Sequence, residues 1–264
     1  MKRLFFFDID GTLIDCEKGI YDIHEEVINS LNKLKESGHN VFLATGRCKC
    51  FIVDGVMKYP FDGYVTCNGA CVEYKGKTVY KKIIPTHSLK AVHDFCLKHN
   101  CAYYFENNEW IYVLNKDNPK HLLFKDEWGM KDEVIVDEFN IDEIECYIGM
   151  IVLNDESQVP LMNDLLGGYF NIQRHVAGLS FDLTLKDESK LHGIEELSQY
   201  LDVAIQDTVA FGDARNDIEM LSGVGKGIAM GNGTKEAKEA ADYITTSIHD
   251  HGIVNALKYW KYIS

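Results

Sequence analysis

Two aspartates near the start of the chain have the type and spacing to do chemistry. Asp8 and Asp10 lie at the end of an apolar run, Leu4–Ile9, and are followed by Gly11 and Thr12. If this run is a strand of an open parallel sheet, both carboxylates lie at its carboxyl end, where such sheets bind ligands. Neighbouring carboxylates repel unless a cation neutralises them, and Mg²⁺ prefers oxygen ligands and accepts phosphate as a further one. Taken alone, the segment could also be a turn that leads into a helix.

Two further segments contain groups that could hold a phosphate. Thr45 and Gly46 follow a second apolar run, and their hydroxyl and backbone amides could bind a phosphate oxygen, although Thr45 could instead cap a helix. Lys190 begins a predicted helix, where an ammonium is electrostatically unfavourable unless an anion lies close. Because lysines at exposed helix starts are common, Lys190 alone identifies no site.

A second acidic segment follows the apolar run Thr208–Phe211. Asp213 and Asp217 are four residues apart, with Asn216 between them, so a helical turn places both carboxylates on one face. Like charges at this spacing repel each other, which again indicates a cation beside them.

Together these residues resemble the four motifs of the haloacid dehalogenase superfamily, in order and spacing: Asp8-x-Asp10-Gly11-Thr12, Thr45 after an apolar strand, Lys190, and Gly-Asp213-x-x-Asn216-Asp217. The segment between the third strand and the lysine resembles the type-2 cap of its Cof-like hydrolases. Further segments strengthen the likeness: Ala-Thr-Gly-Arg47, Cys-Asn68-Gly69-Ala, Ile-Ala-Met-Gly-Asn232-Gly and Ala-Asp-Tyr-Ile-Thr245. The resemblance implies a Mg²⁺-dependent phosphomonoester hydrolase that acts on small phosphorylated metabolites, with sugar phosphates as the first expectation.

The resemblance also implies a role for each residue. Asp8 would be the nucleophile that forms an aspartyl-phosphate, and Asp10 would be the general acid and base. Thr45 and Lys190 would hold the transferred phosphoryl group. The residues expected at the metal are Asp8, Asp10, Asp213 and Asp217, with Asp217 and Asn216 in the outer layer. The residues expected at the substrate are Gly11, Thr12, Gly46, Arg47, Asn68, Gly69 and Asn216.

The apolar pattern predicts an α/β fold, a doubly wound Rossmann-like parallel sheet core with an inserted α+β cap domain. Residues 1–82 and 185–264 are expected to form the core, and residues 83–184 the cap. The expected strands of the core are Leu4–Ile9, Asn40–Thr45, Gly63–Cys67, Thr208–Phe211, Gly227–Met230 and Asp242–Thr245. Its expected helices are His24–Ser37, Lys190–Leu201, Asn216–Ser222, Thr234–Ala240 and Gly252–Trp260, and a hairpin is expected over Val72–Tyr80. In the cap, the expected strands are Ala102–Glu106, Trp110–Leu114, Glu145–Leu153, Phe170–His175 and Leu179–Leu185, and the expected helices are Ser88–His99, Pro119–Glu127 and Val159–Leu166.

The composition of the chain limits the classes of partner that the protein is expected to bind. The 264 residues are 46% hydrophobic and carry a formal net charge of −14, which disfavours nucleic acids and anionic membranes. Asp8 and Asp10 interrupt the N-terminal apolar run, so no signal peptide is expected. No apolar run reaches about 18 residues, so no membrane span is expected either, and the cytoplasm is the expected compartment. The eight cysteines are too sparse for a disulfide scaffold and are expected to remain thiols. A monomer or weak homodimer acting on a small molecule is the resulting expectation.

Two other functions stay open on the sequence. A phosphomutase of the same superfamily would need its cap to grip a second phosphate, and the predicted cap contains one arginine, Arg174, which favours hydrolysis. A non-catalytic sensor of phosphorylated metabolites would be favoured by loss of Asp8, Asp10 or Lys190, and all three are present. His249 and His251 form a His-x-His pair that could bind metal, but a polar loop is the simpler interpretation.

Overall fold

The computed structural model describes residues 2–114, 130–175 and 178–264 and divides the chain into two compact units. The core unit comprises Met1–Gly46, Ile52–Tyr80 and Ser189–Ser264. The inserted unit comprises Lys81–Glu188 together with the short segment Arg47–Phe51. The helix predicted over 119–127 lies outside the described residues. The domain boundaries were predicted at 82/83 and 184/185. That prediction assigned residues 47–51 to the core, whereas the structure groups them with the inserted unit.

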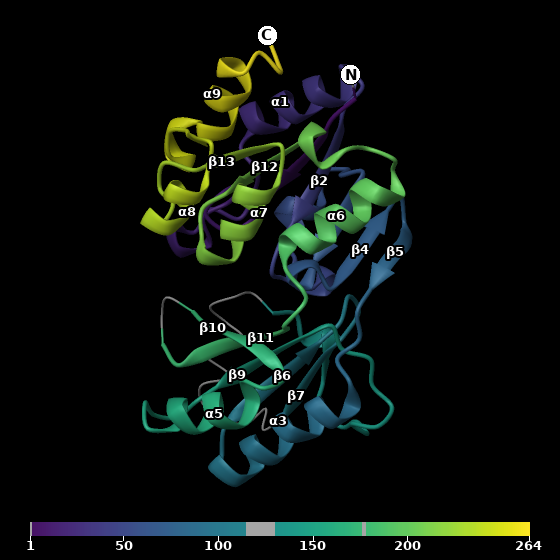
Figure 1. The fold of residues 1–264 in the computed structure, drawn as a ribbon, viewed down its shortest axis with the longest axis vertical. Helices are drawn as coiled ribbons and strands as arrows, with labels where there is room; N and C mark the ends of the chain where they lie inside the picture. Colours follow the sequence, from purple (N-terminus) through teal and green to yellow (C-terminus); the bar gives the residue numbers. More distant parts are fainter. Residues whose placement is uncertain (1, 115–129, 176–177) are drawn as a thin grey trace. The chain divides into compact units, whose positions relative to one another are not determined.

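The core unit is built on an eight-stranded sheet with the order β14-β13-β12-β1-β2-β3-β4-β5 (Figure 1). The six strands from β14 to β3 run parallel to their neighbours, and β4 pairs antiparallel with β3. Because β1 lies between β2 and β12, the ends of these three strands meet at one edge of the sheet. The strands are β1 (Leu4–Phe7), β2 (Asn40–Ala44), β3 (Gly63–Thr66), β4 (Cys71–Tyr74), β5 (Lys77–Lys81), β12 (Thr208–Gly212), β13 (Lys226–Ala229) and β14 (Tyr243–Ile244).

Helices cover both faces of this sheet, and β1 shows why. Phe5 and Phe7 point into one apolar cluster with α1 and α9, whereas Leu4 and Phe6 point into another with α6 and α7. Successive side chains of a strand point to opposite faces, so a strand covered on both sides needs a continuous apolar run. The core helices are α1 (Glu25–Glu36), α2 (Asp54–Met57), α6 (Lys190–Tyr200), α7 (Ile218–Gly223), α8 (Lys235–Ala240) and α9 (Gly252–Tyr259).

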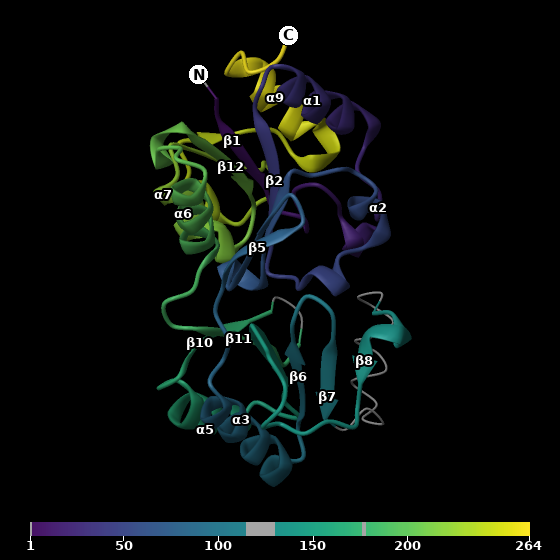
Figure 2. The same cartoon turned by 90° about the vertical axis from the view of Figure 1, so that its right-hand side faces the viewer.

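The inserted unit contains a six-stranded sheet with the order β10-β11-β9-β6-β7-β8 (Figure 2). Its pairs are antiparallel except β7 with β8, which are parallel. α3 (Thr86–His99) and α5 (Gln158–Leu166) pack on one face, over a core that includes Tyr103, Phe105 and Leu183. The strands are β6 (Ala102–Glu106), β7 (Ile111–Leu114), β8 (Ile135–Val136), β9 (Ile148–Val152), β10 (Phe170–Arg174) and β11 (Ser180–Leu185).

The predicted fold class is confirmed, and most differences from the prediction lie at element ends. The first strand ends at Phe7, two residues earlier than predicted, and β9 begins at Ile148 rather than Glu145. The helix predicted from Asn216 begins as a short 3₁₀ turn, Arg215–Asp217, before α7. The two-residue strand β8 was not predicted, because so short a segment carries no readable alternation.

Candidate active site

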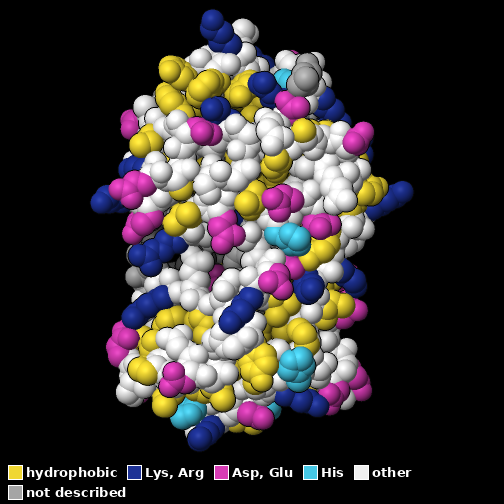
Figure 3. All heavy atoms as spheres, in the orientation of Figure 1, with side chains coloured by type: hydrophobic (Ala, Val, Ile, Leu, Met, Phe, Trp, Pro, Cys, Tyr) yellow, Lys and Arg dark blue, Asp and Glu magenta, His cyan; other side chains and the backbone are white. Residues whose placement is uncertain are grey.

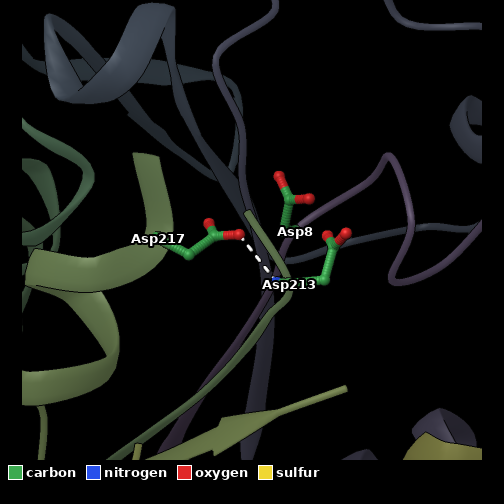
Figure 4. A group of neighbouring side chains, drawn as sticks. All are labelled: Asp8, Asp213 and Asp217. Atoms are coloured by element: carbon green, nitrogen blue, oxygen red, sulfur yellow. Dashed lines mark hydrogen bonds between the residues drawn. The ribbon is translucent and has the colours of Figure 1, made fainter. Parts of the chain in front are cut away.

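The candidate site lies at the carboxyl ends of β1 and β12. Asp8 directly follows β1, and Asp213 directly follows β12. These strands are hydrogen-bonded neighbours in parallel register, and the Asp8 amide donates to the Phe211 carbonyl at 3.0 Å. The two carboxylates are therefore brought together from positions about 200 residues apart along the chain, because the two strands that they follow are neighbours in the sheet. Figure 4 shows them with Asp217, which extends from the helical turn after β12.

Lys190 neutralises part of this acidic group. Its Nζ lies 2.6 Å from Asp8 Oδ1 and 2.7 Å from Asp217 Oδ1, and its side chain is fully buried. Lys190 is the first residue of α6, where the Ser189 side chain caps the helix by accepting from the His192 amide. Burial alone would lower the pKa of Lys190. The charges of the Asp217 and Asp8 carboxylates and their hydrogen bonds to Lys190 have the larger effect and raise the pKa above its ordinary value. The ammonium is therefore charged at any physiological pH.

Asp217 connects Lys190 to the loop that carries Asp213. Its Oδ1 accepts from Lys190, while its Oδ2 accepts from the backbone amides of Asp213 at 2.8 Å and Ala214 at 2.9 Å. The first of these amide bonds is the dashed line in Figure 4. Both oxygens are thus already bonded within the protein, so Asp217 fixes the direction of Asp213 as well as the position of Lys190.

The acidic group carries more negative charge than Lys190 can balance. Burial raises the pKa of Asp8 well above its ordinary value, Lys190 opposes this, and the neighbouring aspartates raise it further. Burial and Asp217 likewise raise the pKa of Asp213 to about 7. Carboxylate oxygens of Asp8, Asp213 and Asp217 lie within 4.8 Å of one another. An all-oxygen set with excess negative charge fits a hard divalent cation such as Mg²⁺.

The turn after Asp8 packs tightly against Asp213. Gly11 has a φ of +79°, and a Cβ at this position would lie 2.2 Å from Asp213 Oδ2. The hydroxyl of Thr12 donates to Asp213 Oδ1 at 3.3 Å. Asn232 supports the turn from the loop after β13, since its Nδ2 donates to the Gly11 carbonyl at 2.7 Å. Asn232 had no predicted role; its place in the Met-Gly-Asn232-Gly segment was the only signal.

A second group of predicted residues meets at the ends of β2 and β3. Thr45 is buried; its amide donates to Val65, and its carbonyl accepts from the Asn68 amide at 3.1 Å. Asn68 in turn accepts from the Asn216 side chain at 3.2 Å. Gly69 has a φ of +98°, and a Cβ there would lie 1.9 Å from the Ser189 carbonyl oxygen. The loop after β3 therefore lies against the start of α6, where Lys190 begins.

Arg47 is the predicted site residue that groups with the inserted unit. Its guanidinium donates to the Phe51 carbonyl at 3.0 Å and lies over the Phe51 ring, 4.9 Å from the centroid. The structure brings together, within the core unit, the predicted residues Asp8, Gly11, Thr12, Lys190, Asp213 and Asp217, and separately links Thr45, Gly46, Asn68 and Asn216. Asp10 lies between Asp8 and Gly11 and pairs with Ile14 in an isolated bridge.

Comparison with known proteins decides the family. Residues 5–257 match the family model of haloacid dehalogenase-like hydrolases. The chain belongs to this family. It is 28% identical over 257 residues to YkrA of Bacillus subtilis (strain 168), which carries a provisional phosphatase name, and the match covers 97% of both chains. It is 27% identical over 272 residues to the HMP-PP phosphatase of Yersinia pestis (strain Pestoides F), covering 98% of this chain and 96% of that one.

Solved structures agree with the family assignment. The HAD subclass IIB sugar phosphatase BT4131 aligns with a TM-score of 0.86 and 29% identity, covering 99% of this chain and all of that one. The predicted membership among Cof-like haloacid dehalogenase hydrolases is confirmed, and the chain is a phosphatase. Over the described residues, no helix has the length and apolar character needed to cross a membrane.

The contact between Gly11 and Asp213 yields a prediction with a matched control. Gly11→Ala adds a Cβ that must displace the Asp213 carboxylate, whereas Gly19→Ala meets nothing within 4 Å at a similar φ of +73°. Both variants should lose about 1 kcal/mol of stability from backbone strain. Gly11→Ala alone should lower kcat/KM by roughly 100-fold, because misplacement by about 1 Å is that costly. Equal loss of activity in the two variants, measured beside thermal unfolding, would contradict this role for Gly11.

Replacement of Lys190 should destabilise the fold in a pH-dependent way. Lys190→Met leaves Asp8 and Asp217 buried without their shared cation, which should cost about 3–5 kcal/mol of unfolding free energy at pH 8. Without Lys190 the pKa of Asp8 rises further above its unfolded value, so the folded variant takes up a proton as the pH falls. The deficit should therefore shrink at pH 5. Urea titrations at both pH values measure it.

The control for this measurement is Lys235→Met. Lys235 is 83% exposed and pairs with Glu239 one helical turn away, so its loss should cost less than about 0.5 kcal/mol at either pH. A deficit in Lys190→Met that stays constant from pH 5 to pH 8 would show that buried carboxylate charge is not its cause.

Proposed function

We propose that this protein is a Mg²⁺-dependent phosphomonoester hydrolase that transfers the phosphoryl group of a small metabolite to Asp8 and then to water. The observation that carries the proposal is the buried pairing of Lys190 with Asp8 and Asp217, beside Asp213. The pairing holds a carboxylate oxygen of Asp8 in one direction, and a fixed, ionised carboxylate is what a nucleophile at phosphorus requires.

The metal would be held by the carboxylates of Asp8 and Asp213 with the backbone carbonyl of Asp10, and Asp217 would orient this set through Lys190 and the Asp213 loop. Bound there, Mg²⁺ would offset the charge of the carboxylates and of the substrate phosphate. The donor set fits this ion because its members are oxygens and because the buried charge exceeds what Lys190 neutralises. Metal binding should also keep Asp8 and Asp213 ionised near neutral pH.

In the first half-reaction an oxygen of Asp8 forms a bond to phosphorus as the bond from phosphorus to the ester oxygen breaks. Asp10 gives its proton to the leaving oxygen, so the product is an alcohol. In the second half-reaction water attacks the phosphorus of the aspartyl-phosphate, Asp10 accepts the proton of that water, and Asp8 leaves as a carboxylate. Inorganic phosphate is released, and both aspartates return to their starting protonation states.

Lys190 and the loop around Thr45 would hold the phosphoryl oxygens during both steps. Two of the three N–H groups of Lys190 bond to Asp8 and Asp217, and the third can bond to a phosphoryl oxygen. Such fixed donors stabilise charge that develops in the transition state without having to reorganise. The remaining substrate contacts would come from Gly11, Thr12, Gly46, Arg47, Asn68, Gly69 and Asn216.

A small sugar phosphate is the proposed substrate class. Support comes from the similarity to the sugar phosphatase BT4131 over the whole chain. Other relatives are named for HMP-PP and for 5-amino-6-(5-phospho-D-ribitylamino)uracil, so heterocyclic phosphates belong in the same assay. On the face drawn in Figure 3, acidic and basic side chains are interspersed, and the net charge of −14 disfavours a polyanionic substrate. In the inserted unit Arg174 pairs with Glu156, which disfavours a second phosphate site of the kind a mutase needs.

The test is phosphate release from a panel of sugar phosphates and heterocyclic phosphates. Wild-type protein should turn over at least one ester when Mg²⁺ is present and lose activity when EDTA is added. Asp8→Asn removes the nucleophile but keeps its shape, and should lower kcat by more than about 1,000-fold. Asp22→Asn makes the same change at an aspartate whose side chain is 71% exposed, and should stay within about twofold. Turnover that survives in Asp8→Asn would contradict the mechanism.

A further inference from the structure

A short turn directly after Gly46 brings two cysteine sulfurs together. Cys48 Sγ and Cys50 Sγ lie 3.4 Å apart at the start of the 3₁₀ turn Lys49–Phe51. Cys48 is fully buried, whereas Cys50 is partly exposed. A disulfide needs its two sulfurs at about 2.0 Å, so the two sulfurs must move closer, with an adjustment of the turn that joins them.

Three consecutive residues, 48 to 50, bond to the last residue of β6 and to the connection that follows it. Cys48 is hydrogen-bonded to the carboxyl group of Glu106, the Lys49 amide donates to Asn108 Oδ1 at 2.9 Å, and the Cys50 thiol donates to the Asn107 carbonyl at 3.5 Å. The turn is therefore held at a defined place in the inserted unit. Gly46 and Ile52 belong to the core unit, so the chain passes from the core unit into this segment and back again within a few residues.

Glu106 provides a proton acceptor beside the pair. Burial raises the pKa of Glu106 to about 7, and the hydrogen bond from Cys48 counteracts part of that rise. A carboxyl group with this pKa exchanges protons near neutral pH and can take the proton that Cys48 must lose to become a nucleophile.

A metal site is the other chemistry that two close cysteines could indicate. Among the residues that the structure describes, the one group of three or more ligand atoms close enough to share an ion is Asp8, Asp213 and Asp217. Within the described part of the chain, no third ligand of this kind joins Cys48 and Cys50, so the geometry favours thiol chemistry over metal binding.

We infer that Cys48 and Cys50 form a thiol–disulfide modification site that a hydroperoxide oxidises. The partly exposed Cys50 reacts first: its sulfur bonds to one peroxide oxygen, the O–O bond breaks, and the other oxygen takes the Cys50 proton and leaves as an alcohol, or as water when the oxidant is hydrogen peroxide. Cys48 then gives its proton to Glu106 and attacks the Cys50 sulfur, forming the S–S bond, and the sulfenic oxygen takes that proton from Glu106 and leaves as water. Two thiols and one hydroperoxide thus give one disulfide, and the sulfurs supply the two electrons that the peroxide accepts.

The disulfide should lower kcat/KM, a consequence that rests on the proposed function. The bond draws Cys48 and Cys50 together and alters the turn that holds Arg47, directly after Thr45 and Gly46. Fixing this turn in a different shape should lower kcat/KM by roughly tenfold, mainly through KM, because a phosphate-binding loop loses its aligned geometry. A thiol reductant should restore the original value.

The test treats the reduced full-length protein with hydrogen peroxide, alkylates the remaining thiols, and maps the product by peptide mass. The expected product lacks two hydrogens and two alkylation sites, both within the peptide that contains 48 and 50. Cys48→Ser and Cys50→Ser should each abolish this product, whereas Cys16→Ser, at another partly exposed cysteine, should leave it unchanged. Oxidation of Cys50 to a sulfinic acid with Cys48 still alkylated would overturn the inference.

Activity measured on the same samples tests the effect of the disulfide on kcat/KM separately from the formation of the disulfide. A tenfold fall in kcat/KM that dithiothreitol reverses, absent in Cys48→Ser, supports the effect on catalysis. A disulfide that forms without any change in kcat/KM overturns that effect. If the reduced protein hydrolyses no ester at all, the proposed function fails, and the mass measurement still decides whether the disulfide forms.

Discussion

A single buried ammonium connects the elements that make up the site. Lys190 bonds to Asp8 at the end of β1 and to Asp217 in the turn after β12, and all three side chains are buried. A buried ion pair is costly to form and far more costly to break, so the three groups depend on one another. The start of α6, the end of β1 and the turn before α7 must therefore take up their positions together.

The same interaction leaves the site with unbalanced charge. Lys190 contributes one positive charge against Asp8, Asp213 and Asp217, and the pKa values of Asp8 and Asp213 are raised as a result of burial and of mutual repulsion. Structural ion pairs are usually balanced, since an uncompensated buried charge is unfavourable. Raised pKa values in a group that also has the oxygen ligands for a hard cation are typical of a functional site. A divalent cation would resolve the imbalance, and the substrate phosphate would then meet a locally positive centre.

Much of this arrangement could be predicted from the sequence because it depends on local signals. Continuous apolar runs such as Leu4–Phe7 predicted a sheet covered on both faces, and acidic residues at two strand ends predicted a shared site. The confirmed parts are the fold class, the family and the phosphatase class; the residue roles and the domain boundaries stay predictions. The motifs that resemble those of the haloacid dehalogenase superfamily lie in both the N-terminal and the C-terminal parts of the chain. The sequence therefore predicted that these two parts together form the core.

The features that were missed depend on contacts between distant segments. The support that Asn232 gives to Gly11 joins positions 221 residues apart, and no local pattern indicates it. The grouping of Arg47–Phe51 with the inserted unit arises from bonds to Asn107 and Asn108, which lie between two predicted strands and carry no signal of this contact. The turn that brings Cys48 near Cys50 is likewise set by these bonds, so the sequence alone showed two cysteines but not their contact.

The central claim is that Asp8 becomes phosphorylated during turnover. The most direct measurement is an acid quench of the enzyme during steady hydrolysis, followed by mass analysis of the N-terminal peptide, in wild type and in Asp10→Asn. Asp10→Asn removes the base for the second half-reaction, whereas the first half-reaction still proceeds with an aryl phosphate, whose leaving group needs no proton. With such a substrate the account predicts a phosphoryl group on Asp8 that accumulates in this variant above the wild-type level. Substrate hydrolysis by either protein with no phosphoryl group on Asp8, or with one on a different residue, would contradict the account.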